Sequence, residues 1–254
     1  MPALYEIYNA FEIKIPSSIK EGWDNVGLIV GDLNCEINGA IVALDCTMNV
    51  IDEAISKNAN LIITHHPFIF DGVKNIDFSS PFGKKLEKLI KNNINVLSLH
   101  TNFDKASMGT GDILSNTLGL TNIKNLTEDE FSLGKVGEIS PCTLKELLNL
   151  VKDKLNLSSV KYVGNDDAIV KKVALVPGSG SEFYIDAYKN NADVFITAEV
   201  KHHIGIECME LGMAIVDAGH FETENISLIT LKEIAEKFVK TEISESYKKL
   251  FKYI

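Results

Sequence analysis

The hydrophobic pattern of the chain switches between helical and extended spacing in a regular order. Near the N-terminus, Leu4, Ile7, Tyr8 and Phe11 recur at the spacing that predicts an amphipathic helix. Further along, short apolar runs rich in β-branched side chains lead into loops, after which helical spacing returns. This alternation of strand and helix is typical of an α/β fold with crossover helices.

Two stretches of the chain repeat this alternation. Residues 38–67 read NGAIVALDCTMNVIDEAISKNANLIITHHP, and residues 170–200 read VKKVALVPGSGSEFYIDAYKNNADVFITAEV. Downstream, INVLSLHTNFD and MAIVDAGHFETE each place an apolar run before a histidine that has a carboxylate four residues later. We therefore predict an α/β protein of two similar lobes that arose by internal duplication, with mostly parallel sheets.

The junction between the lobes is predicted near residues 127–137, TEDEFSLGKVG. This gives a first α/β lobe at 1–126 and a second at 127–254. A final helix is expected between residues 226 and 238, where four apolar side chains share one face, and it could pack on either lobe, including back on the first. Those side chains are Leu228, Leu231, Ala235 and Phe238.

All six histidines lie in these repeats or in the segment EVKHH. Strand carboxyl ends are where open α/β sheets bind ligands, although a single histidine there is more often a hydrogen-bonded core or loop residue. Histidines paired with carboxylates at fixed spacing favour a metal site for zinc, iron, manganese or cobalt. The pairs are His100 with Asp104 and His220 with Glu224, and each acid could equally be an ordinary helix N-terminal residue.

His65 and His66 are adjacent at the end of an apolar run. Neighbouring side chains of an extended chain point to opposite sides, and Pro67 favours extended geometry at His66. We therefore expect the two imidazoles to bind different ions of a closely spaced pair. Glu224 is the expected bridge between the ions, because a longer carboxylate spans two cations more easily.

Two loops have competing interpretations. In VPGSGSEF, residues 176–183, the amides of Gly178 and Gly180 could hold an anion, but a plain tight turn is the better prediction. In WDNVGL, Trp23 could be a buried aromatic that anchors a turn, whereas the family resemblance described below implies that this segment lies near the metal cleft.

Composition restricts the classes of function. The formal net charge is −10 and all 25 basic residues are lysine, so the chain lacks the arginines that read phosphates and guanine best. The composition therefore argues against nucleic-acid binding. The four cysteines are far apart, which favours reduced thiols and a cytoplasmic protein, and no apolar run is long enough for a membrane helix.

Five motifs in a fixed order resemble those of the NIF-three-like family of dinuclear-metal proteins, whose bacterial members are often called GTP cyclohydrolase I type 2 homologs. They are WDNVGLIVGD, ITHHPFIF, HTNFD, KHH and GHFETE. The resemblance implies two α/β lobes, two divalent metal ions in the cleft between them, and a toroidal homohexamer. One departure is Ala198, where the family commonly has glycine before the acid, and we expect only a small backbone adjustment there.

The resemblance also implies roles for particular residues. The implied metal ligands are His65, His66, Asp104, His220 and Glu224. For a metal-dependent hydrolase, independently of the resemblance, His100 or Glu199 could act as general base or acid. Second-shell or substrate-facing positions are expected for Asp24, Asn25, Lys201, His202 and His203.

Two functions are compatible with these residues. The first is a metal-dependent hydrolase that acts on a nucleotide-like or related small molecule, with two metals activating water. The alternative is a non-enzymatic metal-binding or regulatory ring, such as a metal store, a chaperone or a protein-interaction platform. The uncommitted polar residues around KHH favour the enzyme, while the substrate and the metal stay open.

Overall fold

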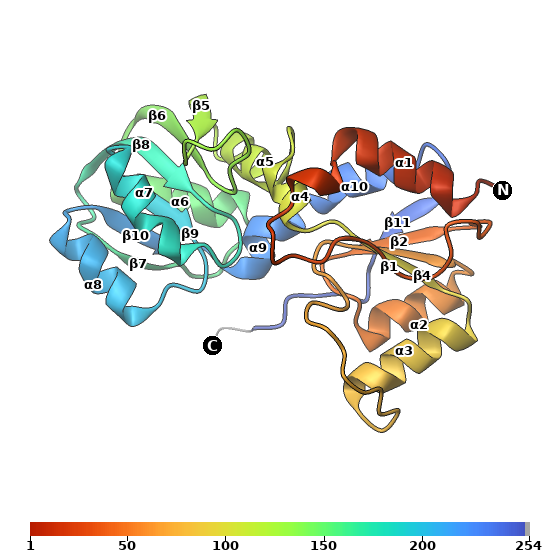
Figure 1. Cartoon of the computed structure of the whole chain (residues 1–254). Coiled ribbons are helices and arrows are strands. Elements are labelled where there is room, and N and C mark those ends of the chain that lie inside the picture. Colours follow the sequence, from red (N-terminus) through yellow and green to blue (C-terminus); the bar gives the residue numbers. More distant parts are fainter. Residues whose placement is uncertain (252–254) are drawn as a thin grey trace. The chain divides into compact units, whose positions relative to one another are not determined.

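The computed structural model describes residues 1–251, which form two compact units (Figure 1). Unit 1 consists of Met1–Ala106 and Leu228–Lys248, and unit 2 consists of Ser107–Ser227 with the described residues from Lys249 onward. The boundary expected between residues 126 and 127 falls inside unit 2. The last helix, α10 (Leu228–Ala235), belongs to unit 1.

Unit 1 is built on a five-stranded sheet in the order β1-β4-β3-β2-β11. Only β1 is antiparallel to its neighbour, and the other pairs are parallel. Every residue of β2, β3 and β4 is buried, as expected for parallel strands with helices on both faces. The strands are β1 (Gly27–Val30), β2 (Ala40–Ala43), β3 (Leu61–Thr64), β4 (Asn95–Ser98) and β11 (Thr241–Ile243).

The helices of unit 1 cover its sheet from two sides (Figure 1). One face packs on α2 (Met48–Ser56) and α3 (Pro81–Lys91), whose apolar sides join a core with Ile41, Ile62 and Val96. The other face carries α10 and the N-terminal helix α1 (Leu4–Lys14), which confirms the first predicted helix. Shorter helices are η1 (Ser17–Ile19) and α4 (Thr101–Lys105).

Unit 2 is built on a six-stranded sheet in the order β5-β6-β8-β9-β10-β7. Only β8, β9 and β10 are parallel, while the three remaining pairings are antiparallel. The prediction of mostly parallel sheets is therefore right for unit 1 and wrong for unit 2. The strands are β5 (Thr121–Asn125), β6 (Lys135–Thr143), β7 (Lys161–Val163), β8 (Ile169–Leu175), β9 (Val194–Thr197) and β10 (Ala214–Asp217).

Alternating side chains of this second sheet feed two separate cores. Val173 and Leu175 of β8 face a core with α5 and α6, whereas Ala174 between them faces a core with α7 and α8. The helices of unit 2 are α5 (Thr110–Thr117), α6 (Leu144–Lys154), η2 (Ser181–Phe183), α7 (Tyr184–Lys189), α8 (His202–Glu210) and α9 (His220–Asn225).

The strand order expected from the repeat is present in both units. In unit 1, β2, β3 and β4 are consecutive parallel neighbours, and in unit 2 the same is true of β8, β9 and β10. In each unit an antiparallel strand pairs with the last strand of the triplet: β1 pairs with β4, and β7 pairs with β10. The carboxyl ends of each triplet therefore meet at one edge of its sheet, where the histidines follow.

Candidate metal centre

Three histidines of unit 1 gather at the carboxyl edge of its sheet. His65 and His66 follow β3, and His100 follows β4 just after Leu99. The ends of these strands are adjacent because Thr64 pairs with Ser98 in the parallel ladder. One ligand atom from each of the three imidazoles lies within 4.8 Å of those of the other two.

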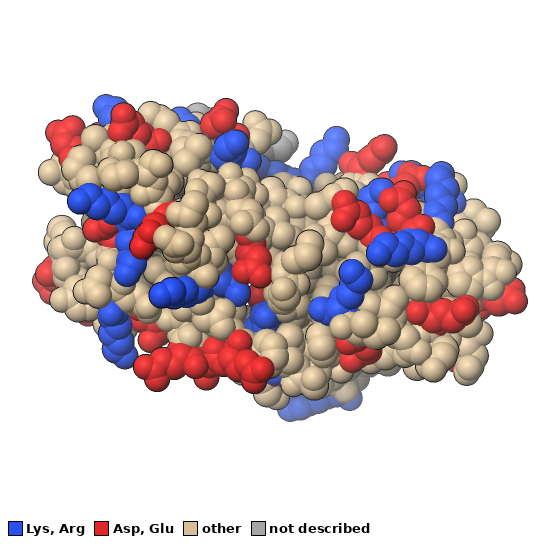
Figure 2. Space-filling view, turned by 90° about the horizontal axis from the view of Figure 1, so that it is seen from above, with Lys and Arg blue, Asp and Glu red and all other residues tan. Residues whose placement is uncertain are grey.

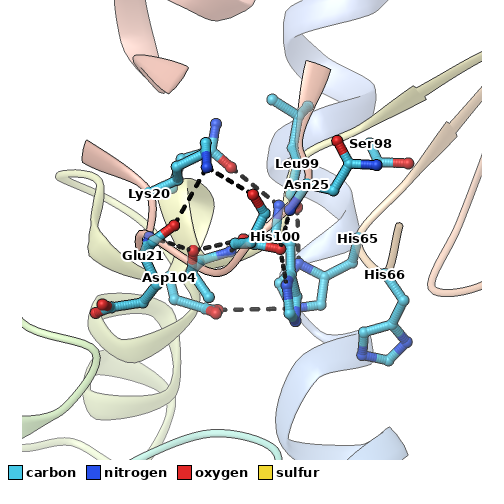
Figure 3. Close-up of polar contacts among 12 residues, drawn as sticks. Lys20, Glu21, Asn25, His65, His66, Ser98, Leu99, His100 and Asp104 are labelled. Carbon is cyan, nitrogen blue, oxygen red and sulfur yellow. Dashed lines mark hydrogen bonds and ion pairs between the residues drawn. The ribbon is translucent and has the colours of Figure 1, made fainter. Parts of the chain in front are cut away.

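His65 is fully buried and held in one orientation. Its Nδ1 lies 2.9 Å from the carbonyl oxygen of Leu99, and because a carbonyl only accepts, Nδ1 must carry the proton. Its Nε2 lies 3.6 Å from Oδ1 of Asp104, as Figure 3 shows. A neutral imidazole in this tautomer presents its Nε2 lone pair beside a carboxylate, an arrangement typical of a metal-ligating histidine.

His66 is oriented by two residues that sequence reasoning missed. Its Nδ1 lies 3.1 Å from Oδ1 of Asp45, and the hydroxyl of Tyr247 donates to the other oxygen of that carboxylate. Asp45 could have been found from its place just after the apolar run of β2, since polar groups at strand ends are candidates for the site. Tyr247 gives no local signal, because it is 202 residues away from Asp45 in the sequence.

The expected divergence of the two adjacent imidazoles is wrong. The strand β3 ends at Thr64, and both histidines lie in a bend rather than in extended chain. Their ring centroids are therefore only 5.1 Å apart, with 47° between the planes. The assignment of His65 and His66 to different ions stays a prediction, but extended geometry no longer supports it.

His100 has the same kind of support as His66. Its Nδ1 lies 2.9 Å from Oδ1 of Asp24, and Oδ2 of Asp24 accepts from both the amide and the hydroxyl of Thr101. Burial raises the pKa of Asp24, but hydrogen bonds from His100 and Thr101 outweigh burial and lower that pKa to about 2. Asp24 is thus a carboxylate that fixes the ring of His100, a geometry suited to a ligand as well as to a proton-transferring base.

Unit 2 provides one histidine between two carboxylates. His220 begins α9, and its Nε2 lies 3.1 Å from Oε2 of Glu224, one helical turn later. On the other side of the ring, Nδ1 lies 2.8 Å from Oε1 of Glu199. Glu224 is 4% exposed, so its carboxylate sits in surroundings that favour a nearby cation.

The loop at 176–183 lies against this pair and leaves no room for a side chain. Gly178 has φ +62°, and a Cβ there would lie 2.1 Å from Oε1 of Glu224. The amide of Gly178 donates to Thr223 and that of Gly180 donates to Thr197, so both already have acceptors. The tight-turn prediction is therefore confirmed over the anion-binding alternative.

Glu199 reaches His220 from an unusual backbone conformation. Its φ is +54°, a left-handed value that costs a non-glycine residue on the order of 1–3 kcal/mol. Ala198 before it is fully buried and donates its amide to the carbonyl of Gly178 at 2.9 Å. Ala198 is not itself left-handed, and the left-handed conformation falls on the next residue, Glu199.

The remaining predicted residues fall into two groups. Asp24 supports His100 directly, and the side chain of Asn25 donates to the carbonyl of Ile69 at 2.6 Å. Lys201, His202 and His203 are exposed at the start of α8. Lys201 and His202 line a cavity of about 210 Å³ on unit 2, together with Tyr162 and Asp217.

The donor set fits a divalent transition metal in both units. Unit 1 presents imidazoles with the carboxylate of Asp104, and unit 2 presents an imidazole with the carboxylate of Glu224. Imidazole nitrogen with carboxylate oxygen suits zinc, iron, manganese or cobalt better than calcium or magnesium.

Comparison with known proteins identifies the family of the chain. The sequence model of Duf34/NIF3 (NGG1p interacting factor 3) matches residues 2–249. A protein of Clostridium acetobutylicum named GTP cyclohydrolase 1 type 2 homolog is 40% identical over 91% of this chain and 88% of its own length. A protein of the same name from Clostridium perfringens is 38% identical over 99% of both chains.

Solved structures show the same fold. A Staphylococcus aureus hypothetical protein superposes with a TM-score of 0.91 at 29% identity, covering 99% of both chains. A Bacillus cereus protein related to NIF3 superposes with a TM-score of 0.92 at 25% identity, covering 100% of this chain and 99% of its own. The chain belongs to the Duf34/NIF3 family.

Proposed function

We propose that the protein binds two divalent transition-metal ions and hydrolyses a nucleotide-like or related small molecule. One observation carries the proposal: in four histidines, Nδ1 lies 2.8–3.1 Å from an oxygen acceptor, which leaves Nε2 as the nitrogen suited to a metal or a proton. The four are His65, His66 and His100 in unit 1 and His220 in unit 2.

The proposed ligands come from both units, as the family resemblance implies. Unit 1 would supply His65, His66 and Asp104, and unit 2 would supply His220 and Glu224, with Glu224 as the bridge. When bound, two divalent ions supply Lewis acidity that activates water and stabilises a leaving oxygen.

His100 and Glu199 then have different tasks. We assign proton transfer to His100, because Asp24 holds its Nδ1 and a nitrogen of its ring lies within 4.8 Å of ligand atoms of His65 and His66. We assign a positioning task to Glu199, because its carboxylate contacts Nδ1 of His220. Replacement of His100 by glutamine should lower turnover about 10²- to 10⁴-fold while the metal content stays unchanged. Loss of one metal equivalent from that variant would make His100 a ligand instead.

The substrate class rests on the names of relatives. Two relatives at 38% and 40% identity carry the name GTP cyclohydrolase 1 type 2 homolog, which suggests a nucleotide-like molecule. Because a fold and its metals do not determine the reaction, turnover must be measured directly.

The test begins with elemental analysis of protein purified without a metal-affinity tag. About two equivalents of a transition metal per chain are expected. The same protein is then screened against phosphoesters, nucleotides and cyclic amides, with a chelator-treated sample as control. Metal binding without metal-dependent turnover would reject the hydrolase and favour the metal-binding or regulatory ring.

Assembly and location are proposed on the same basis. We expect a toroidal homohexamer, which light scattering at micromolar concentration would reject by finding a monomer. We also expect a cytoplasmic protein, since all four cysteines are free thiols. None of the helices in the described part of the chain is long and apolar enough to span a bilayer.

Nucleic acid is not the proposed partner. Figure 2 shows lysine and acidic side chains interspersed over most of the face in view. At a net charge of −10, long-range repulsion of a polyanion is expected at physiological salt. Tight binding of duplex DNA at that salt would contradict this expectation.

A further inference from the structure

Two large aromatic side chains stand exposed beside the histidines of unit 1. Trp23, the only tryptophan of the chain, is 59% exposed, and Phe70 is 48% exposed. Their ring centroids are 5.7 Å apart and their planes are tilted by 45°. Of the two interpretations of WDNVGL, the buried turn anchor is therefore wrong. Exposed aromatics grouped in this way mark a surface that contacts another molecule.

Both rings lie beside His100, the residue proposed to transfer protons. The ring centroid of Trp23 lies 6.1 Å from that of His100, and Phe70 lies at the same distance. The centroid of His100 is in turn 5.2 Å from that of the buried His65. A flat molecule resting on Trp23 and Phe70 would therefore have its edge close to the imidazole cluster.

The segments that carry the two aromatics are tied to each other and to the sheet edge. The side chain of Asn25, two residues after Trp23, donates to the carbonyl of Ile69, which precedes Phe70. Asp24 is buried and bonded to His100 and Thr101, and Lys20 donates to its carbonyl at 2.6 Å. The segments that carry the two rings are thus anchored before a ligand arrives, which lowers the entropy cost of binding.

We propose that Trp23 and Phe70 form a stacking platform for the planar aromatic ring of the substrate, such as a nucleobase. The platform deepens the proposed function, because it names the part of the substrate that is recognised next to the metal ligands. Stacking on aromatic side chains tolerates different bases, since every base has a π face. The platform therefore requires a flat heterocycle and does not select a particular one.

The same loop offers a matched control. Phe78 is an exposed phenylalanine at 54% exposure, eight residues beyond Phe70 in the sequence. Removal of either ring deletes a similar exposed apolar area, but of the two only Phe70 makes ring contacts with Trp23 and His100. If the exposed loop instead docks a second copy of the chain, Phe70→Ala and Phe78→Ala should change the oligomeric state alike.

The experiment uses Trp23 as its own reporter. Metal-loaded full-length protein is titrated with guanosine and adenosine, and with ribose 5-phosphate, which lacks the ring. Both nucleosides should quench the tryptophan fluorescence and ribose 5-phosphate should not. Phe70→Ala should weaken nucleoside binding about 10- to 100-fold, and Phe78→Ala should leave it unchanged. Trp23→Phe lacks the fluorescent reporter, so its binding is measured by calorimetry, and it should retain most of the affinity.

The metal content of each sample separates this proposal from the proposed function. A full metal complement without nucleoside binding would reject the platform and leave the metal centre standing. Nucleoside binding and quenching without metal-dependent turnover would support the platform and reject the hydrolase. Equal changes in oligomeric mass for Phe70→Ala and Phe78→Ala, with nucleoside affinity unchanged, would assign the surface to contact between copies and overturn the platform.

Discussion

The triplets β2-β3-β4 and β8-β9-β10 have the same strand order, but different side chains follow their carboxyl ends. After β3 the chain continues with His65 and His66, whereas after β9 it continues with Ala198 and Glu199 at the corresponding positions. Unit 1 thereby gathers three imidazoles, and unit 2 places one imidazole between two carboxylates. Because ladder hydrogen bonds use only the backbone, side chains at the strand ends can diverge while the sheet stays the same.

The two edges are also supported differently. In unit 2 the supporting residues are at most 45 residues away in the sequence, since the amide of Gly178 donates to Thr223, next to Glu224, and the left-handed Glu199 contacts His220. In unit 1 the support of His66 comes through Asp45 from Tyr247, far away in the sequence. The comparison therefore predicts that unit 2 is sensitive to backbone changes beside the site and unit 1 to changes in the C-terminal segment.

The largest expected effect is on metal content. Glu224→Ala should lose most of both metals because it removes the proposed bridge, while His65→Ala and His66→Ala should each lose about one equivalent. Elemental analysis of each purified variant is the measurement, and His203→Ala, an exposed residue on α8, is the control. Full metal content and unchanged thermal stability in the first three variants would place the metal site elsewhere.

The next effect isolates the contact between Gly178 and Glu224. Gly178→Ala adds a Cβ that would lie 2.1 Å from Oε1 of Glu224 at a φ of +62°, so it should cost about 3 kcal/mol or more in free energy of unfolding. Gly212→Ala is the control, because Gly212 has φ +71° with open space around it, and it should cost only about 1 kcal/mol. Urea titration measures both, and equal costs would show that the Glu224 contact contributes nothing.

A smaller effect concerns the anchor of the C-terminal segment in unit 1. Glu53 accepts hydrogen bonds from Ser244 and from the amides of Glu245 and Ser246, which hold the segment that leads to Tyr247. Glu53→Gln should cost about 2 kcal/mol in free energy of unfolding at neutral pH. The control, Glu242→Gln, removes a partly exposed partner of Lys57 and should cost less than about 1 kcal/mol.

The pH dependence of the Glu53 anchor sharpens that test. Burial raises the pKa of Glu53, but the hydrogen bonds from Ser244, Glu245, Ser246 and Lys57 hold it far below its ordinary value of 4.5. A lowered folded-state pKa stabilises the protein above 4.5, and this stabilisation is lost as the pH falls below that value. The difference between wild type and Glu53→Gln should therefore shrink in acid, and a difference independent of pH would contradict the charge-based account.

The parts of this molecule that could be predicted are those with a local pattern. The similarity of NANLIIT and NADVFIT was enough to predict the shared strand order, and the histidines at the strand ends were visible in the sequence. The antiparallel strands of unit 2 were not predicted, since β7 has only three residues and β5 is largely exposed and polar. Contacts such as Glu53 with Ser244, 191 residues apart, depend on tertiary folding and leave no trace in a local window.

The smallest expected effect tests whether the C-terminal segment tunes the metal site of unit 1. Tyr247→Phe removes one hydroxyl that donates to Asp45, so the carboxylate should hold Nδ1 of His66 less firmly. Because the hydroxyl acts through Asp45, the loss of metal affinity should be a few-fold, whereas Asp45→Asn should cost about 10- to 100-fold. Chelator competition measures the affinity, and thermal unfolding of the metal-free proteins tests for a purely structural effect. Equal metal affinity in wild type and Tyr247→Phe would confine the contribution of Tyr247 to folding.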